Sequence, residues 1–279
     1  MERMGAGSLQ LAERYLEALV ARDPARLSLA AAHRFTENGV ELPLGEGLWK
    51  TARAVRTRRV FADAGAGQAL VFAVLEDERG LALLAARLGF AGDALRELET
   101  LLTHQGESSI FAAESLLARP PLEARALAPP ERGERSELVR VVDAYFEGIE
   151  RDSSAGVPFH PACQRIENGL QMTSNPAVLG GLGVAEQFDH KVFAYIERVR
   201  ARRYPLADVE TGQVLAIVFL DVPGTVTSIE LGGRRIELPP HIRKPRSTLL
   251  FELFTVESGR IRAIEAFMHN LPYGASAGW

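Results

Sequence analysis

Apolar residues recur every three or four positions near the start of the chain and again near its middle. Leu11, Tyr15 and Leu19 fall on one face of a helix, so this pattern predicts a helix over residues 9–21. The same spacing predicts a matching helix over residues 137–150. Shorter helices are predicted over residues 48–58, 110–117 and 184–202.

Between these helices, apolar runs bounded by Gly, Asn and Asp predict strands. In the first half, an extended segment at 35–44 is followed by strands at 60–62, 69–76, 81–90 and 95–103. The second half has an extended segment at 165–173 and strands at 214–220, 249–256 and 261–269. An added hairpin at 226–238 is predicted to turn at Gly232-Gly233.

The two halves also share residues. Tyr15 and Tyr145, and the tripeptides Glu37-Asn38-Gly39 and Glu167-Asn168-Gly169, align without a gap at a spacing of 130 residues (145 − 15). Three further blocks follow in the same order, pairing residues 55–59 with 199–203, 67–68 with 212–213, and 96–99 with 262–265. Blocks in one order indicate a duplicated fold. The predicted domains are 1–118 and 136–279, joined by a Pro-rich linker at 119–135.

Composition excludes several classes of protein. Hydrophobic residues make up 47% of the chain and charged residues 24%, which is ordinary for a protein that buries a core. The net charge of −4 gives no electrostatic reason to bind nucleic acid or an anionic membrane, because phosphate binding needs clustered, uncompensated Lys and Arg. No apolar run of about 18 residues predicts a membrane span, and the first ten residues lack a signal peptide, so we expect a cytoplasmic protein.

The chemistry-bearing residues predict neither a metal nor a cofactor. Cys163 is the single cysteine, which excludes an intramolecular disulfide and any multi-cysteine metal site. The few His residues form no ligand cluster by spacing, so we predict no metal. Gly180-Gly181-Leu182-Gly183 follows no convincing strand, which argues against a dinucleotide cofactor.

The order helix, extended segment, helix and antiparallel meander resembles the nuclear transport factor 2-like superfamily, which includes SnoaL-like cyclases and ketosteroid isomerases. Residues 36–45 (TENGVELPLG) and 259–267 (GRIRAIEAF) are similar to segments of such domains. The resemblance implies an α+β fold of two tandem cone-shaped domains, each a strongly curved antiparallel sheet wrapped around N-terminal helices. It also implies an apolar pocket in the cone, and pairing of the two halves with each other or in a homo-oligomer.

Glu252 is the most conspicuous polar residue of the second half. It lies within the apolar run 249–256, and the aligned residue of the first half is Ala86. Desolvation of a carboxyl raises its pKa and produces a general acid or base near neutral pH. The alternative is a carboxylate paired with an Arg inside the sheet, and the sequence leaves both interpretations open.

Three other residues join Glu252 as catalytic candidates. Arg165 replaces Phe35 of the first half and could hold a carboxylate, phenolate or enolate through its fork of donors. Tyr145 occupies a position where the resemblance implies a tyrosine pointing into the cone, and its hydroxyl could stabilise an oxyanion. His269 could exchange a proton near pH 7. The alternative for Tyr145 and His269 is a structural role, as a buried aromatic with a satisfied hydroxyl and as a structural strand histidine.

The remaining candidates are predicted to bind substrate. His160 lies in a predicted loop, and Glu167 belongs to the repeated tripeptide, where it could instead stabilise the turn. Phe193, Tyr195 and Phe254 would supply flat apolar surface.

These residues predict activity in the second half, with the first half a structural partner. The expected function is a cofactor-independent lyase, dehydratase or isomerase that acts by general acid and base proton transfer, in a reaction of the elimination or retro-aldol type, on a small aromatic or polycyclic hydroxylated molecule. The alternative is a non-catalytic carrier of an apolar small molecule.

Overall fold

The structure, a computed structural model, describes residues 2–118, 125–231 and 233–279, which form two compact units. Unit 1 extends to Arg125 and includes Ser276–Trp279, and unit 2 is Ala126–Ala275. The predicted linker therefore does not separate the units as one block: residues 126–135 belong to unit 2, and residues 119–124 lie outside the described residues. The last four residues pack with unit 1, which the sequence did not indicate.

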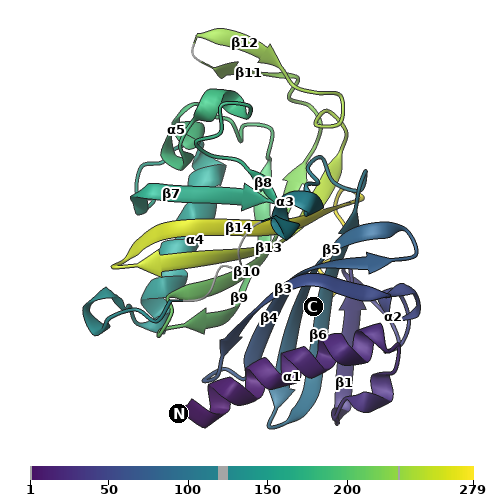
Figure 1. The fold of residues 1–279 in the computed structure, drawn as a ribbon. Helices are drawn as coiled ribbons and strands as arrows, with labels where there is room; N and C mark the ends of the chain where they lie inside the picture. Colours follow the sequence, from purple (N-terminus) through teal and green to yellow (C-terminus); the bar gives the residue numbers. More distant parts are fainter. Residues whose placement is uncertain (1, 119–124, 232) are drawn as a thin grey trace. The chain divides into compact units, whose positions relative to one another are not determined.

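Unit 1 is one six-stranded sheet with a long helix on one face (Figure 1). The strand order is β2-β1-β6-β5-β4-β3, and α1 packs against β3 and β4. Its elements are α1 (Glu2–Val20), η1 (Pro24–Arg26), β1 (Leu29–Glu37), β2 (Val40–Glu41), α2 (Leu48–Thr51), β3 (Ala54–Asp63), β4 (Gln68–Asp77), β5 (Gly80–Ala91), β6 (Ala94–His104) and α3 (Ala113–Leu117).

Unit 2 repeats this plan in the order β8-β7-β14-β13-β10-β9, with α4 packed against β9 and β10. The identical strand order confirms the duplication predicted from the repeated blocks. A separate hairpin, β11 with β12, is the predicted insertion. The elements are η2 (Pro129–Glu131), α4 (Arg135–Arg151), β7 (Phe159–Glu167), β8 (Leu170–Gln171), η3 (Leu179–Gly181), α5 (Val184–Asp189), β9 (Arg198–Asp208), β10 (Gln213–Val222), β11 (Ser228–Leu231), β12 (Arg234–Glu237), β13 (Arg246–Glu257) and β14 (Arg260–Leu271).

Strand register confirms that Ala86 of the first half and Glu252 of the second half occupy equivalent positions. In unit 1, Thr100 lies between Glu37 and Ala86 in the ladder. In unit 2, Ala266 lies in the same way between Glu167 and Glu252. Ala86 therefore occupies the position of Glu252, so the buried carboxyl is present in unit 2 and replaced by a methyl group in unit 1.

The α+β class is as predicted, but the sheets differ in two respects. The β1–β6 and β7–β14 pairs are parallel, while the other pairs are antiparallel. In each unit, a long connection through the intervening helix and strands separates the two strands of the parallel pair. This connection lets the second strand run in the same direction as the first. The sheets are also twisted and open rather than strongly curled (Figure 1).

The short helices are shorter than predicted. The helix expected at 48–58 ends at Thr51, and the one expected at 184–202 ends at Asp189. Residues 54–58 and 198–202 are instead the starts of β3 and β9. There, Arg side chains alternate with smaller residues, and edge strands with one exposed face carry that polar alternation. The helical prediction was wrong for these segments because pairing with β4 and β10 outweighed local propensity.

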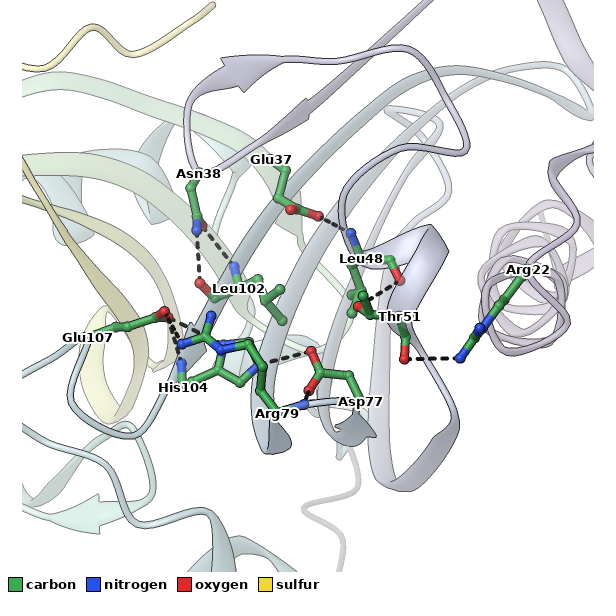
Figure 2. A network of polar contacts seen from close by, with 10 residues as sticks. All are labelled: Arg22, Glu37, Asn38, Leu48, Thr51, Asp77, Arg79, Leu102, His104 and Glu107. Atoms are coloured by element: carbon green, nitrogen blue, oxygen red, sulfur yellow. Dashed lines mark hydrogen bonds and ion pairs between the residues drawn. The ribbon is translucent and has the colours of Figure 1, made fainter.

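The repeated Asn residues act as substitutes for backbone in both sheets. Asn38 Nδ2 donates to the Leu102 carbonyl at 2.9 Å, and Leu102 N donates to Asn38 Oδ1 at 2.8 Å (Figure 2). Asn168 makes the same two bonds with Met268, at 3.0 and 2.8 Å. Both Asn residues have positive φ, of 50° and 42°. The side-chain amide thus continues the hydrogen bonds of the parallel strand pair where the backbone turns away. The positive φ of both Asn residues agrees with the turn that was predicted for this motif.

Candidate active site

Three elements of unit 2 bring polar side chains together on the helix-facing side of the sheet. Strand β7 supplies Arg165 and Glu167, β13 supplies Glu252, and α4 supplies Tyr145. Arg165 is opposite Ile264, and Glu167 is opposite Ala266, which in turn is opposite Glu252. Because directly paired residues share a face, the register places both carboxyls and the guanidinium on one side.

Arg165 lies at the centre of this group and is 1% exposed. Its Nη1 donates to the Tyr145 hydroxyl at 3.4 Å, and its Nη2 donates to Gln187 Oε1 at 2.5 Å. Its Nε lies 2.9 Å from Glu167 Oε1, but the geometry is that of an ion pair without a hydrogen bond. The guanidinium carbon also lies 4.9 Å from the centre of the Phe193 ring. Each part of the cation is thus held by a different element.

Glu252 is 2% exposed. Burial raises the pKa of Glu252 to about 8, and the nearby charge of Glu167 adds to that rise. The Arg165 charge and a hydrogen bond from Tyr145 oppose it. Arg165 supplies one positive charge for two carboxyl groups, so the more deeply buried carboxyl keeps its proton at neutral pH.

Aromatic rings enclose Tyr145. Its ring centre lies 5.1 Å from that of Phe254 and 5.3 Å from that of Phe188, in edge-to-face contacts, and Phe146 and Phe159 lie within 6.2 Å. Burial, and then the Glu252 charge, raise the pKa of Tyr145 well above its usual value. The hydroxyl is therefore protonated, and it can donate to a carboxylate or to an oxygen on which negative charge develops.

Gln187 and Thr173 complete the site, although the sequence did not point to them. Gln187 is fully buried, and its Nε2 donates to the Met172 carbonyl at 2.7 Å, which leaves its Oε1 facing Arg165. Thr173 Oγ1 accepts from the Arg165 backbone N at 2.9 Å. Neutral polar residues in a short helix and a loop carry no signal in a single sequence, so their roles emerge from the contacts alone.

The other predicted site residues are placed differently. Phe193 and Tyr195 lie in the turn between α5 and β9 rather than on a helix, with Phe193 buried and Tyr195 half-buried. His269 is opposite Leu249, three positions from Glu252, so it lies on the other face of the sheet. His160 Nδ1 accepts from Ala162 N at 3.1 Å, at the far end of β7 from Glu167. The structure therefore brings together Arg165, Glu167, Glu252, Tyr145, Phe193 and Phe254, and separates His269 from them.

Within the described ranges, no group of three or more His, Cys, Asp or Glu side chains is placed to hold a metal ion. Across the same described residues, no helix is long and apolar enough to cross a membrane.

Of two comparisons with known proteins by sequence, one matches part of the chain. Residues 131–268 match a family described as a domain of unknown function (DUF8021). A comparison of the sequence with curated proteins found no match.

Two solved structures are similar at low TM-score. A de novo designed protein with a curved β-sheet is 13% identical with a TM-score of 0.29, and the alignment covers 48% of this chain and 87% of that one. AusH from Aspergillus nidulans is 10% identical with a TM-score of 0.30, covering 48% of this chain and 85% of that one. Likeness at these scores does not establish a fold family.

Proposed function

We propose that unit 2 is a cofactor-independent lyase, dehydratase or isomerase that works by general acid and base catalysis. The observation that carries this proposal is a buried carboxyl, Glu252, with a pKa of about 8, hydrogen-bonded to Tyr145 and close to the Arg165 guanidinium. A group that titrates near neutral pH can both accept and return a proton at a useful rate.

In the proposed reaction, Glu252 in its ionised form, which is the minor form at neutral pH, removes a proton from the carbon next to a substrate carbonyl. The electron pair of the broken C–H bond moves to the carbonyl oxygen, which becomes an enolate. Tyr145, held by Arg165, donates a hydrogen bond to that oxygen. Return of the proton to another carbon completes an isomerisation. Loss of a β-hydroxyl group as water, with the proton supplied by Glu252, completes an elimination.

The proposed substrate is a small aromatic or polycyclic hydroxylated molecule. Phe254, Phe188 and Phe193 surround the polar groups with flat apolar surface, which favours a planar ligand. The resemblance of the sequence to SnoaL-like and ketosteroid isomerase-like domains supports the same substrate class, and we include membership of that superfamily in the proposal.

Hydrogen exchange at the α-carbon of 1-tetralone, a bicyclic aromatic ketone, tests this proposal without knowledge of the natural substrate. In D₂O, the wild-type protein should accelerate loss of the C2 proton signal in NMR spectra. Glu252→Gln keeps the side-chain shape and should lower that rate by about 10²- to 10⁴-fold. Glu257→Gln, on the same strand, is the matched control and should retain the rate. Equal rates for Glu252→Gln and wild type, or no exchange with wild type, would contradict the proposal.

The alternative is a carrier that binds an apolar molecule without converting it. Its supporting observation is the low exposure of Arg165 and Glu252, at 1% and 2%, which requires the surrounding side chains to move before a substrate reaches either group. Saturable binding of 1-tetralone with no proton exchange would favour the carrier.

A further inference from the structure

The buried face of α5 lies against the candidate site of unit 2. This helix packs against β7, the strand that carries Arg165 and Glu167 (Figure 1). Three polar side chains lie close together on α5, and they are Glu186, Gln187 and Asp189. The two carboxylates are exposed, whereas Gln187 is fully buried and contacts Arg165. The helix therefore presents a neutral amide to the site and keeps its charges at the surface.

The amide of Gln187 is held in one orientation. Its Nε2 donates to the Met172 carbonyl at 2.7 Å and to the Leu182 carbonyl at 3.2 Å, so both amide hydrogens are used. Its Oε1 accepts from Arg165 Nη2 at 2.5 Å. A reversed amide would direct its hydrogens at a guanidinium, which has no acceptor, and its oxygen at two carbonyl oxygens. Gln187 therefore presents an acceptor, and not a donor, to Arg165.

This contact fixes the direction of the Arg165 guanidinium. Its Nη1 donates to the Tyr145 hydroxyl at 3.4 Å, and its Nε lies 2.9 Å from Glu167 Oε1 without a hydrogen bond. Among the described residues, the guanidinium therefore donates hydrogen bonds to Tyr145 and Gln187. The bond to Gln187 is the shorter of the two, and it holds Nη2 so that Nη1 is directed at the Tyr145 hydroxyl.

Gln187 also leaves the charge of Arg165 intact. The titratable groups that act on Glu252 are Tyr145 of α4 and Arg165 and Glu167 of β7. A carboxylate in place of the Gln187 amide would be a third acid around one guanidinium. It would offset part of the positive charge that now stabilises the ionised form of Glu252. A neutral acceptor therefore holds the cation in place without cancelling it.

Unit 1 lacks both members of this pair. Phe35 occupies the position of Arg165 on the equivalent strand. The helix at the equivalent place in the chain order, α2, has apolar side chains, Leu48 and Trp49, at both of its buried positions. All three belong to the apolar core of unit 1. The buried acceptor is thus present on this helix in the unit that has the cation, which is expected if the role of Gln187 is to hold Arg165.

We propose that Gln187 is a positioning residue for the unit 2 reaction: it holds the Arg165 guanidinium against the Tyr145 hydroxyl and leaves the positive charge of Arg165 available to Glu252. Gln187 acts through Arg165 and does not exchange a proton itself. The inference rests on the proposed function of unit 2, because it assigns a further residue to that same site.

The titration of Glu252 tests the charge part of this role without a substrate. In protein labelled with ¹³C at the glutamate carboxyls, the NMR signal that is missing from Glu252→Gln belongs to Glu252. Gln187→Glu keeps the shape and the acceptor and adds a negative charge beside Arg165, so the midpoint of the Glu252 titration should rise by about one pH unit. Gln213→Glu makes the same change at a buried glutamine of β10 and should shift the midpoint far less. An unchanged midpoint in Gln187→Glu would overturn the proposal.

The exchange of 1-tetralone tests the positioning part. Gln187→Met keeps the side-chain volume and removes the acceptor, so the rate at saturating 1-tetralone should fall by about 10- to 100-fold with little change in KM. Gln213→Met is the matched control and should retain the rate. Wild-type activity in Gln187→Met, or an equal loss in Gln213→Met, would overturn the positioning role. If Gln187→Met does not fold, the Glu252 midpoint in Gln187→Glu decides.

The two measurements also separate this inference from the proposed function. No exchange by the wild-type protein would contradict the proposed function of unit 2. The Glu252 midpoint is measured without turnover, so in that case it still shows whether Gln187 governs the charge that Arg165 offers to Glu252.

Discussion

At the scale of single residues, the candidate site of unit 2 is governed by a shortage of positive charge. Arg165 faces Glu167 and Glu252, and each group lies where water screens charges weakly. One carboxylate can be balanced by the guanidinium, but a second would be a buried charge without compensation. The proton on Glu252 resolves this imbalance, which links the pKa of one residue to both stability and the proposed catalysis.

The pH dependence of stability should report that proton. The pKa of Glu252 is raised from 4.5 to about 8 in the folded state, so between these values the folded protein binds more protons than the unfolded chain. Its free energy of unfolding should therefore fall as the pH rises from about 5 to about 8, by up to roughly 4 kcal/mol. Amide hydrogen exchange of β13 at several pH values measures this change. In Glu252→Gln the decrease should disappear, and in Glu257→Gln it should persist. Parallel pH profiles for Glu252→Gln and wild type would contradict the assignment.

Removal of the cation should be costly. In Arg165→Met, the Glu167 carboxylate loses its ion pair and Gln187 Oε1 loses its donor. Loss of one partner from a buried pair destabilises a protein by about 3–5 kcal/mol. Arg151→Met removes an exposed pair with Glu147 and should change stability by less than about 1 kcal/mol. Thermal unfolding of the two variants compares them directly. Similar melting temperatures would contradict the prediction, because they would show that the Arg165 ion pair contributes little to stability.

At the scale of elements, the repeated Glu-Asn-Gly turn ends the strand that forms the parallel pair of each sheet, which is β1 with β6 in unit 1 and β7 with β14 in unit 2. The chain reverses at Asn38 or Asn168, and the side-chain amide completes hydrogen bonds that the turning backbone no longer makes. The neighbouring glutamates diverge: Glu37 accepts from Leu48 N, while Glu167 pairs with Arg165. Both units thus use the Asn of this turn in the same structural role, whereas the glutamate beside it has different partners in the two units.

Substitution of these asparagines should be destabilising in both units. Asn168→Ala leaves the Met268 N–H and carbonyl without partners, at a cost of about 1–3 kcal/mol for each unpaired group. Asn38→Ala should have a similar effect through Leu102. Asn168→Asp keeps the acceptor but not the donor. Its stability in urea denaturation should therefore lie between those of wild type and Asn168→Ala. An Asp variant less stable than the Ala variant would indicate that charge burial, and not the missing bond, dominates.

At the scale of the whole molecule, the chain contains two units of one fold, and its last residues belong to the first of them. Trp279 Nε1 donates to Thr36 Oγ1 at 2.9 Å, and the guanidinium carbons of Arg34 and Arg87 each lie 4.7 Å from its ring. Gly278 permits this docking, because a Cβ there would lie 2.4 Å from the Gly39 carbonyl oxygen. Unit 1 is therefore completed by residues that follow unit 2 in the sequence.

Trp279→Ala should weaken unit 1 selectively. The indole is half-buried, so its loss should cost about 1–3 kcal/mol, less than that of a fully buried tryptophan. Hydrogen exchange should show faster exchange of amides on β1 and β6 and no change on β13. Trp279→Phe keeps the ring but not the indole N–H and should lie between wild type and the alanine variant. Uniform acceleration in both units would contradict the assignment of the tail to unit 1.

The sequence by itself determined the features that depend on local pattern and on repetition. Helical spacing located α1 and α4, apolar runs located the central strands, and the repeated blocks predicted one fold in two copies. The same alignment paired Ala86 with Glu252, which the strand register confirms. These features are readable because an amphipathic period and a duplicated order are properties of the chain before it folds.

Only the tertiary structure decided the features that depend on partners distant in sequence. Pairing with β4 and β10 turned residues 54–58 and 198–202 into strands, and strand register placed His269 on the face opposite to Glu252. The contacts of Gln187 with Arg165, and the docking of Trp279 near Thr36, join residues that no local pattern relates. A buried polar group is defined by what desolvates and pairs it, and those neighbours become identifiable once the sheet has assembled.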